Sequence, residues 1–192
     1  SLKSTNQVSV IFFGDGCFEE GVVHESLNFS ALHNLPVIFI CENNEFSVYT
    51  HLNERQPKRP IHQIAKAHGL TSHAGNGNDI EEVVTIAQHA VDNARKGKGP
   101  QFIELSTHRW REHCGPDFDD HLGYRAAEEI EMGLKNCPIK KFSARLSENN
   151  ELSKSDIEKL EAEIREEISD AFKFALSSAK PSSKDAGERV YA

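Results

Sequence analysis

The chain has 192 residues, of which 38% are hydrophobic and 27% charged, and its formal net charge is −8. This length and composition are typical of a single water-soluble globular domain. The negative charge and the absence of a long Lys/Arg cluster argue against nucleic-acid binding. No apolar run approaches the ~20 residues needed to cross a bilayer, so we expect neither a nucleic-acid partner nor a membrane.

The cysteines and the first residues indicate the cellular location. The four cysteines show no CxxC spacing, which favours reduced thiols over a disulfide framework. Residues 1–7 are polar and do not resemble a signal peptide. We therefore expect a cytoplasmic protein. The chain begins with Ser1 and not with Met, which we expect of a processed product or a fragment.

Three segments near the start of the chain predict a β-α-β unit. Residues 8–13 and 37–41 are short apolar runs, and residues 18–32 between them have a helical pattern. Both runs are apolar on both faces, as in a parallel sheet that helices cover on two sides. The predicted fold class is therefore α/β, a partial doubly wound parallel sheet with helices on both faces.

Polar residues follow each of these two strands. Gly14-Asp15-Gly16 comes after the first strand and Asn43-Asn44 after the second. A right-handed crossover places both strand ends at the same edge of the sheet, where a carboxylate and an amide oxygen beside a glycine turn suit Mg²⁺ on a phosphate ligand. We predict Asp15 and Asn44 as the metal ligands; taken singly, each residue also suits an ordinary turn.

Residues 45–60 show no periodicity and predict a loop, after which helices and strands alternate. We expect a helix from Pro60 to a stop at Gly69, a short strand at 70–74 and a turn at 75–78. The next helix begins with an Asp79–Glu82 capping box and ends near Arg95, and an interior strand follows at 101–107. The apolar stripe of that helix comprises Ile80, Val83, Val84, Ala87, Val91 and Ala94.

A loop rich in ionisable groups, residues 108–121, follows the last of these strands. It leaves the carboxyl end of a strand, where sheets of this kind bind ligands. Histidine titrates near neutrality, so we predict that His113 does acid–base work or contacts a cofactor. The alternative is a solvated loop histidine.

The carboxyl-terminal part predicts a long helix. Residues 124–142 are expected to be irregular and partly helical. From Ser155 to about Ser177 a helix opens with a capping box formed by Ser155 and Glu158. The apolar stripe of this helix comprises Ile157, Leu160, Ile164, Ile168, Phe172, Ala175 and Leu176.

The motif at the two strand ends resembles the thiamine diphosphate motif, in which Gly-Asp-Gly precedes Asn-Asn by about two dozen residues. Here the gap is 26 residues, 17–42, and residues 20–37 resemble the alpha subunit of 2-oxo acid and acetoin dehydrogenases. In outline the similarity covers the whole chain and corresponds to the carboxyl-terminal two-thirds of that family. Its further landmarks are residues 75–79, 97–100, 104–105, 158–174 and 190–191.

This resemblance implies thiamine diphosphate and Mg²⁺ as cofactors. It implies a backbone carbonyl of Phe46 as a third metal ligand beside Asp15 and Asn44. The implied cofactor-binding residues are Asp15, Gly16, Cys17, Asn44, Ser47 and His113. Residues 1–150 are then a thiamine-diphosphate-binding α/β domain whose amino-terminal part is missing, and residues 151–192 are the carboxyl-terminal helix and tail of the same domain.

The resemblance also implies a reaction and partners. The expected function is decarboxylation of a 2-oxo acid, or cleavage of acetoin, with transfer of the acyl group to a lipoyl acyltransferase. In the family the glutamate that activates the cofactor comes from a beta subunit, and no glutamate here is an evident substitute. We therefore expect a heterotetramer with a beta subunit. The alternatives are a stand-alone decarboxylase or ketolase and a non-catalytic assembly half-domain.

Two features depart from the family pattern. The family carries a longer segment before the Gly-Asp-Gly turn, so we expect a fragment, a split gene product or a half whose other part is a separate chain. In the loop, Arg109 and His113 keep their places, but Cys114 replaces the serine that mitochondrial pyruvate dehydrogenase has phosphorylated. The changed loop leaves the substrate open, and regulation by that phosphorylation is not expected.

Overall fold

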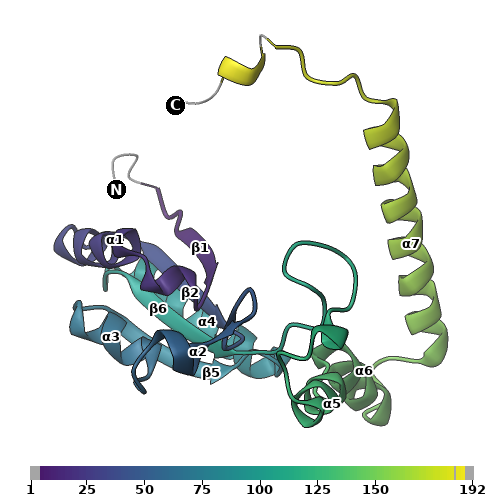
Figure 1. Ribbon diagram of the computed structural model, residues 1–192, viewed down its shortest axis with the longest axis horizontal. Coiled ribbons are helices and arrows are strands. Elements are labelled where there is room, and N and C mark those ends of the chain that lie inside the picture. The colour runs from purple at the N-terminus through teal and green to yellow at the C-terminus, as the bar shows by residue number, and fades with distance from the viewer. Residues whose placement is uncertain (1–4, 184, 189–192) are drawn as a thin grey trace. The chain divides into compact units, whose positions relative to one another are not determined.

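The computed structural model describes residues 5–183 and 185–188, and the chain divides into two compact units, residues 1–142 and 143–192 (Figure 1). The first unit is built on a four-stranded, wholly parallel sheet with the strand order β1-β2-β6-β5. Its strands are β1 (Ser9–Gly14), β2 (Val37–Asn43), β5 (Thr71–Asn76) and β6 (Gln101–Ser106). The predicted strands and the interior position of the last one are confirmed.

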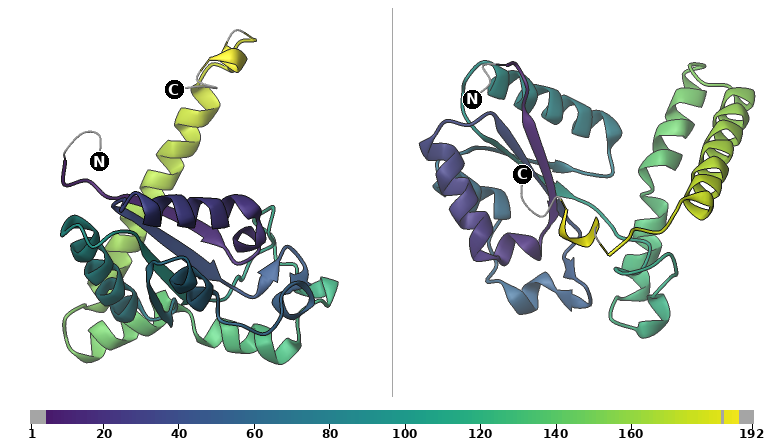
Figure 2. Two further views of the ribbon diagram at one scale, coloured as in Figure 1. Left: turned by 90° about the vertical axis from the view of Figure 1, so that its left-hand side faces the viewer. Right: turned by 90° about the horizontal axis from the view of Figure 1, so that it is seen from above.

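Helices cover both faces of this sheet (Figure 2). Helices α1 (Gly21–Leu32) and α3 (Ile61–Ala67) pack on one face, and α4 (Ile80–Arg95) packs on the other. In β2 the side chains of Phe39 and Cys41 join the first core, whereas Ile38 and Ile40 join the second. Both faces of the strand are therefore buried, which explains its continuous apolar run and confirms the predicted fold class.

The helix expected at residues 18–32 is interrupted, and that prediction is corrected. A 3₁₀ helix, η1 (Cys17–Glu19), comes first, and Glu20 then has an extended backbone with φ −73° and ψ 137°. The α-helix α1 begins only at Gly21. The side chain of Phe18 is buried, with its ring centroid 5.7 Å from that of Phe102. The 3₁₀ helix thus places the Phe18 side chain in the core before α1 begins.

The loop expected at residues 45–60 contains secondary structure. Strands β3 (Phe46–Ser47) and β4 (Thr50–His51) form an antiparallel pair, and α2 (Leu52–Arg55) follows. Elements of two to four residues are too short to show a hydrophobic period, which is why the sequence pattern missed them. Pro60 is the N-cap residue of α3 and not its first helical residue.

The capping box predicted for α4 is confirmed in part. The Asp79 carboxylate accepts from the backbone N–H groups of Glu81 and Glu82, as an N-cap does, whereas the Asp79 N–H donates to the Asn76 carbonyl and not to Glu82. The stripe predicted on this helix is partly wrong. Val84 is 60% exposed, whereas Ala90 and Asn93 are buried. The buried face therefore lies to one side of the predicted stripe.

Helices dominate the rest of the chain. They are η2 (Asp120–Leu122), α5 (Ala127–Lys135), α6 (Pro138–Glu148), α7 (Lys154–Ser177) and η3 (Asp185–Gly187). The capping box of α7 consists of Ser153 and Asp156, not Ser155 and Glu158, so that prediction is wrong by two residues. Within the described residues no helix is long and apolar enough to span a membrane. The landmark at 190–191 lies outside the described residues.

Candidate functional site

Asp15 lies where β1 ends and is fully buried. The last residue of β1, Gly14, pairs with Glu42 of β2, so Asp15 and Asn44 sit at the ends of neighbouring parallel strands. The Asp15 Oδ2 atom accepts from Nη2 of Arg55 at 2.5 Å. Its Oδ1 atom is buried and has no hydrogen-bond partner among the described residues. A buried carboxylate oxygen without a partner costs free energy, and a divalent cation bound there would remove that cost.

Gly16 and Ser47 touch, although 31 positions separate them in the sequence. A Cβ atom built on Gly16 would lie 2.5 Å from Ser47 Oγ and 2.8 Å from Ser47 Cβ. Only glycine therefore allows the β3–β4 hairpin to close on the turn after β1. The structure thus brings together two of the residues predicted to bind the cofactor.

Asn44 and Phe46 are joined by a local hydrogen bond. The Phe46 N–H donates to Oδ1 of Asn44 at 3.0 Å, which holds the amide beside the loop backbone. The Phe46 side chain is buried, and its ring lies 5.4 Å from that of Tyr124. Among the described residues no group of three or more His, Cys, Asp or Glu side chains is placed to hold a metal. A metal here would depend on one carboxylate together with amide and carbonyl oxygens, a set that suits Mg²⁺.

Cys17 and His113 are the two predicted site residues that the structure leaves most open. Cys17 is the first residue of η1 and is exposed. His113 is exposed in the loop after β6. Across residues 5–183 and 185–188, no recorded hydrogen bond or ion pair connects His113 to the Asp15 corner. Its predicted role therefore stays a prediction.

A buried ion-pair network fastens the base of the loop that carries His113. Asp119 accepts from Nη2 of Arg125 at 2.5 Å and from the Tyr124 hydroxyl at 2.6 Å. Burial by itself would raise the pKa of Asp119, but the Tyr124 hydrogen bond and the Arg125 and Arg109 charges hold it below its usual range. The pKa of Tyr124 is raised by burial and by its hydrogen bond to Asp119. These contacts join Arg109 at the start of the ionisable loop to Tyr124 and Arg125 after its end.

Arg109 connects this network to the hairpin. Its Nη2 atom donates to the Val48 carbonyl at 2.8 Å and to the Tyr124 hydroxyl at 2.9 Å. The Tyr124 ring also packs 5.1 Å from that of Tyr49. The start of the loop after β6 is therefore bonded to the turn between β3 and β4.

Several polar residues near the site were missed by the sequence reasoning. Arg55 lies in the stretch without periodicity and bonds to Asp15 and Glu19. Glu104 of β6 accepts from Asn43 Nδ2 at 2.9 Å and from the His62 backbone N–H at 2.8 Å. No local pattern indicates these partners, because each pair is far apart in the sequence.

The family model and the curated relatives match almost the whole chain. The family model described as "Dehydrogenase E1 component" matches residues 1–184. The pyruvate dehydrogenase E1 component subunit alpha of Rhizobium meliloti is 32% identical over 180 residues, which are 93% of this chain and 51% of that protein. The 2-oxoisovalerate dehydrogenase subunit alpha of Bacillus subtilis is 33% identical over 191 residues, which are 100% of this chain and 57% of that protein.

The chain thus spans about half the length of the curated relatives that it matches. Among solved structures, a transketolase from Campylobacter jejuni aligns with 52% of this chain and 15% of its own, at 22% identity and a TM-score of 0.47. Because the family model matches residues 1–184 of 192, this chain belongs to the dehydrogenase E1 component family.

Proposed function

We propose that this chain is the alpha-type part of a thiamine-diphosphate-dependent 2-oxo acid dehydrogenase, and that its Asp15 corner holds the Mg²⁺–diphosphate end of the cofactor. The observation that carries this proposal is the fully buried Asp15 carboxylate with an unpartnered Oδ1. It lies at the end of a parallel strand, directly before the close contact between Gly16 and Ser47. Strand ends of such sheets are where phosphate ligands bind.

The names of the relatives support the substrate class. Two of them are named for pyruvate and for 2-oxoisovalerate, both 2-oxo acids. We propose a 2-oxo acid as the substrate, with acetoin as the alternative that the changed loop at residues 109–114 leaves open. The acyl group would pass to a lipoyl acyltransferase.

Bound thiamine diphosphate supplies the carbanion chemistry of such a reaction. The residues of this chain would bind and orient it: Asp15, Asn44 and the Phe46 carbonyl hold the metal, and the backbone N–H groups of Gly16 and Cys17 approach the diphosphate. Ser47 would close the diphosphate site from the hairpin side. His113 would hold the diphosphate or relay a proton.

We further propose that the site is completed by a beta-type subunit in a heterotetramer. The activation of the cofactor needs a glutamate at its pyrimidine ring, and the candidate site described above offers none for that purpose. Glu19 is engaged with Arg55, and Glu104 is engaged with Asn43 and His62. The resemblance to the dehydrogenase alpha subunits implies that this glutamate comes from the beta-type subunit.

The test is isothermal titration calorimetry of thiamine diphosphate, with and without Mg²⁺, on the chain assembled with a beta-type subunit. We expect Asp15→Asn to weaken Mg²⁺-dependent binding by at least ~2 kcal/mol, the scale of a lost charge-assisted contact. The control is Asp170→Asn, which makes the same charge change at an exposed residue of α7 and should bind like the wild type.

Unchanged affinity and unchanged Mg²⁺ dependence in a folded Asp15→Asn variant would show that the site lies elsewhere. Because this substitution also removes a charge partner of Arg55, the melting curve of the variant is recorded alongside. If the wild type assembles with a beta-type subunit but binds no cofactor, the non-catalytic assembly half-domain becomes the better assignment.

A further inference from the structure

Arg55 is anchored at the candidate metal corner by three separate groups. It is the last residue of α2, and its side chain is 10% exposed. Its Nε atom donates to the Thr50 carbonyl at 3.1 Å, Nη1 donates to Glu19, and Nη2 donates to Oδ2 of Asp15 at 2.5 Å. The planar guanidinium is therefore held in one orientation.

The two oxygen atoms of the Asp15 carboxylate have different surroundings. Oδ2 is occupied by Arg55, whereas Oδ1 is buried without a partner in the described part of the chain. The two oxygens of a carboxylate are rigidly connected, so fixing Oδ2 also fixes the direction of Oδ1. The oxygen left over is the one that a metal would use.

The charges around Arg55 favour a cation beside it. Asp15 and Glu19 carry two negative charges and Arg55 carries one positive charge, which leaves one net negative charge at the corner. Without Glu19, Arg55 would neutralise Asp15 and weaken the attraction for a divalent cation. Glu19 is held in turn by Nε2 of Gln56 at 2.8 Å.

We propose that Arg55 is a positioning residue of the metal site: it holds Oδ2 of Asp15 so that Oδ1 faces the Mg²⁺ ion, and Glu19 keeps Arg55 in place. This inference rests on the proposed function. Partners that orient a metal ligand typically contribute 10- to 100-fold in metal affinity. Arg55 lies in the four-residue helix α2 after the β3–β4 hairpin, and a helix of that length shows no hydrophobic period that could reveal the contact.

The experiment measures Mg²⁺ affinity in the assembled protein at a fixed concentration of thiamine diphosphate, by calorimetry and by the Mg²⁺-dependent rise in melting temperature. Arg55→Gln should raise the Mg²⁺ concentration for half-saturation by about 10-fold or more. Arg55→Lys keeps the charge but loses the planar fork and should give an intermediate loss. The matched control, Arg59→Gln, removes a charge from an exposed arginine four positions away and should leave Mg²⁺ affinity unchanged.

The outcomes separate the inference from the function on which it rests. If the wild type shows no Mg²⁺-dependent cofactor binding, the proposed function fails and the inference fails with it. If the wild type binds Mg²⁺ and the Arg55→Gln protein melts earlier but binds Mg²⁺ equally well, Arg55 is only a structural residue. Tighter Mg²⁺ binding by Arg55→Gln would mean that Arg55 competes with the metal, which also overturns the inference.

Two milder substitutions test the same inference if the Arg55→Gln protein does not fold. Arg55→Lys and Glu19→Gln each leave part of the network in place. If Arg55→Gln yields no folded protein, both of these variants should still bind Mg²⁺ more weakly than the wild type. Wild-type affinity in both would overturn the inference.

Discussion

At the scale of single residues, Gly16 and Ser47 set how closely the two sides of the candidate site approach. A methyl group on Gly16 would lie 2.5 Å from Ser47 Oγ, so one of the two segments must move. We predict that Gly16→Ala destabilises the protein by about 1–3 kcal/mol, the usual cost of overpacking. Urea unfolding measures this change.

The companion variant makes that prediction specific. Ser47→Gly removes both atoms that the new methyl group would meet. The double variant Gly16→Ala, Ser47→Gly should therefore recover most of the lost stability. Equal stability of the single and double variants would show that the close contact does not limit the fold.

His113 is the residue whose predicted role is chemical and not structural. Its side chain is exposed, and the network around Asp119 holds the base of its loop without it. We predict that His113→Gln in the assembled enzyme lowers turnover by about 10²-fold or more if the residue does acid–base work, with the melting temperature nearly unchanged. Normal turnover in the variant would identify His113 as a solvated loop residue.

At the scale of elements, the start of α7 shows which of two serines caps the helix. Ser153 Oγ accepts from the backbone N–H of Asp156, whereas Ser155 is an exposed residue inside the first turn. We predict that Ser153→Ala costs about 1 kcal/mol of helix stability. Ser155→Ala should change it by less than about 0.5 kcal/mol.

Amide hydrogen exchange in the first turn of α7 compares the two variants directly. Faster exchange should appear with Ser153→Ala alone. The reverse pattern, with faster exchange only in Ser155→Ala, would show that Ser155 caps the helix, as the sequence pattern predicted.

At the scale of the whole molecule, two partly buried histidines make stability depend on pH. Burial, and then the neighbouring His24, lowers the pKa of His68 from its ordinary 6.5, and burial with His89 lowers that of His73 in the same way. As the pH falls below about 6.5, the unfolded chain binds protons that the folded protein does not. We therefore predict a melting temperature that falls between about pH 7.5 and about pH 5.5.

Two substitutions check the origin of that slope. Replacing His68 and His73 by glutamine should make the melting temperature depend less on pH over this range, because the two titrating imidazoles are removed. Asp119 does not contribute there, since its pKa lies below its ordinary 3.8 and its stabilising effect is lost only at lower pH. A slope unchanged in the double variant would contradict the assignment.

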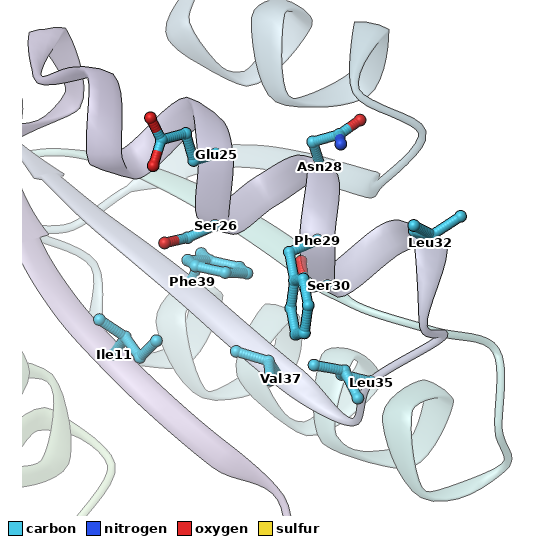
Figure 3. A pocket seen from close by; sticks show the side chains of 10 residues that line it. All are labelled: Ile11, Glu25, Ser26, Asn28, Phe29, Ser30, Leu32, Leu35, Val37 and Phe39. Carbon is cyan, nitrogen blue, oxygen red and sulfur yellow. The ribbon is translucent and has the colours of Figure 1, made fainter.

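The outer edge of β1 and the neighbouring face of α1 are apolar and open. Within the described part of the chain β1 pairs with β2 alone, and Phe12 of β1 is 65% exposed. Between α1 and the sheet lies a groove of about 540 Å³ whose lining includes Ile11, Phe29 and Leu32 (Figure 3). Unpaired strand edges and exposed apolar surface favour association. We predict that the isolated chain is not a stable monomer.

Sedimentation velocity of the purified chain tests this prediction. The chain should self-associate, and Phe12→Lys together with Leu32→Lys should raise the monomer fraction. The matched control places two lysines at exposed polar positions of α7, Ser169→Lys and Ser177→Lys, which add the same charge and leave the β1 edge intact. A compact wild-type monomer with a sharp melting transition would refute the prediction.

The sequence by itself determined the elements whose signals are local. The central strand β2 is a continuous apolar run because both of its faces are buried. Asp79 marks the start of α4 because a cap acts on backbone groups two and three residues away. The Gly-Asp-Gly and Asn-Asn corners were placed on one edge because parallel strands connected by a helix must end on the same side. These inferences need only short-range patterns and chain topology.

Only the tertiary structure decided which distant residues complete the site. Arg55 reaches Asp15 across 40 positions, and Ser47 closes on Gly16 from a two-residue strand. Neither contact has a sequence signal, because elements of two to four residues have no hydrophobic period and the partners are set by how the hairpin folds back on the sheet. The buried face of α4 differs from the predicted stripe for a related reason. Which face of an amphipathic helix is buried depends on the sheet that it packs against, and not on the helix alone.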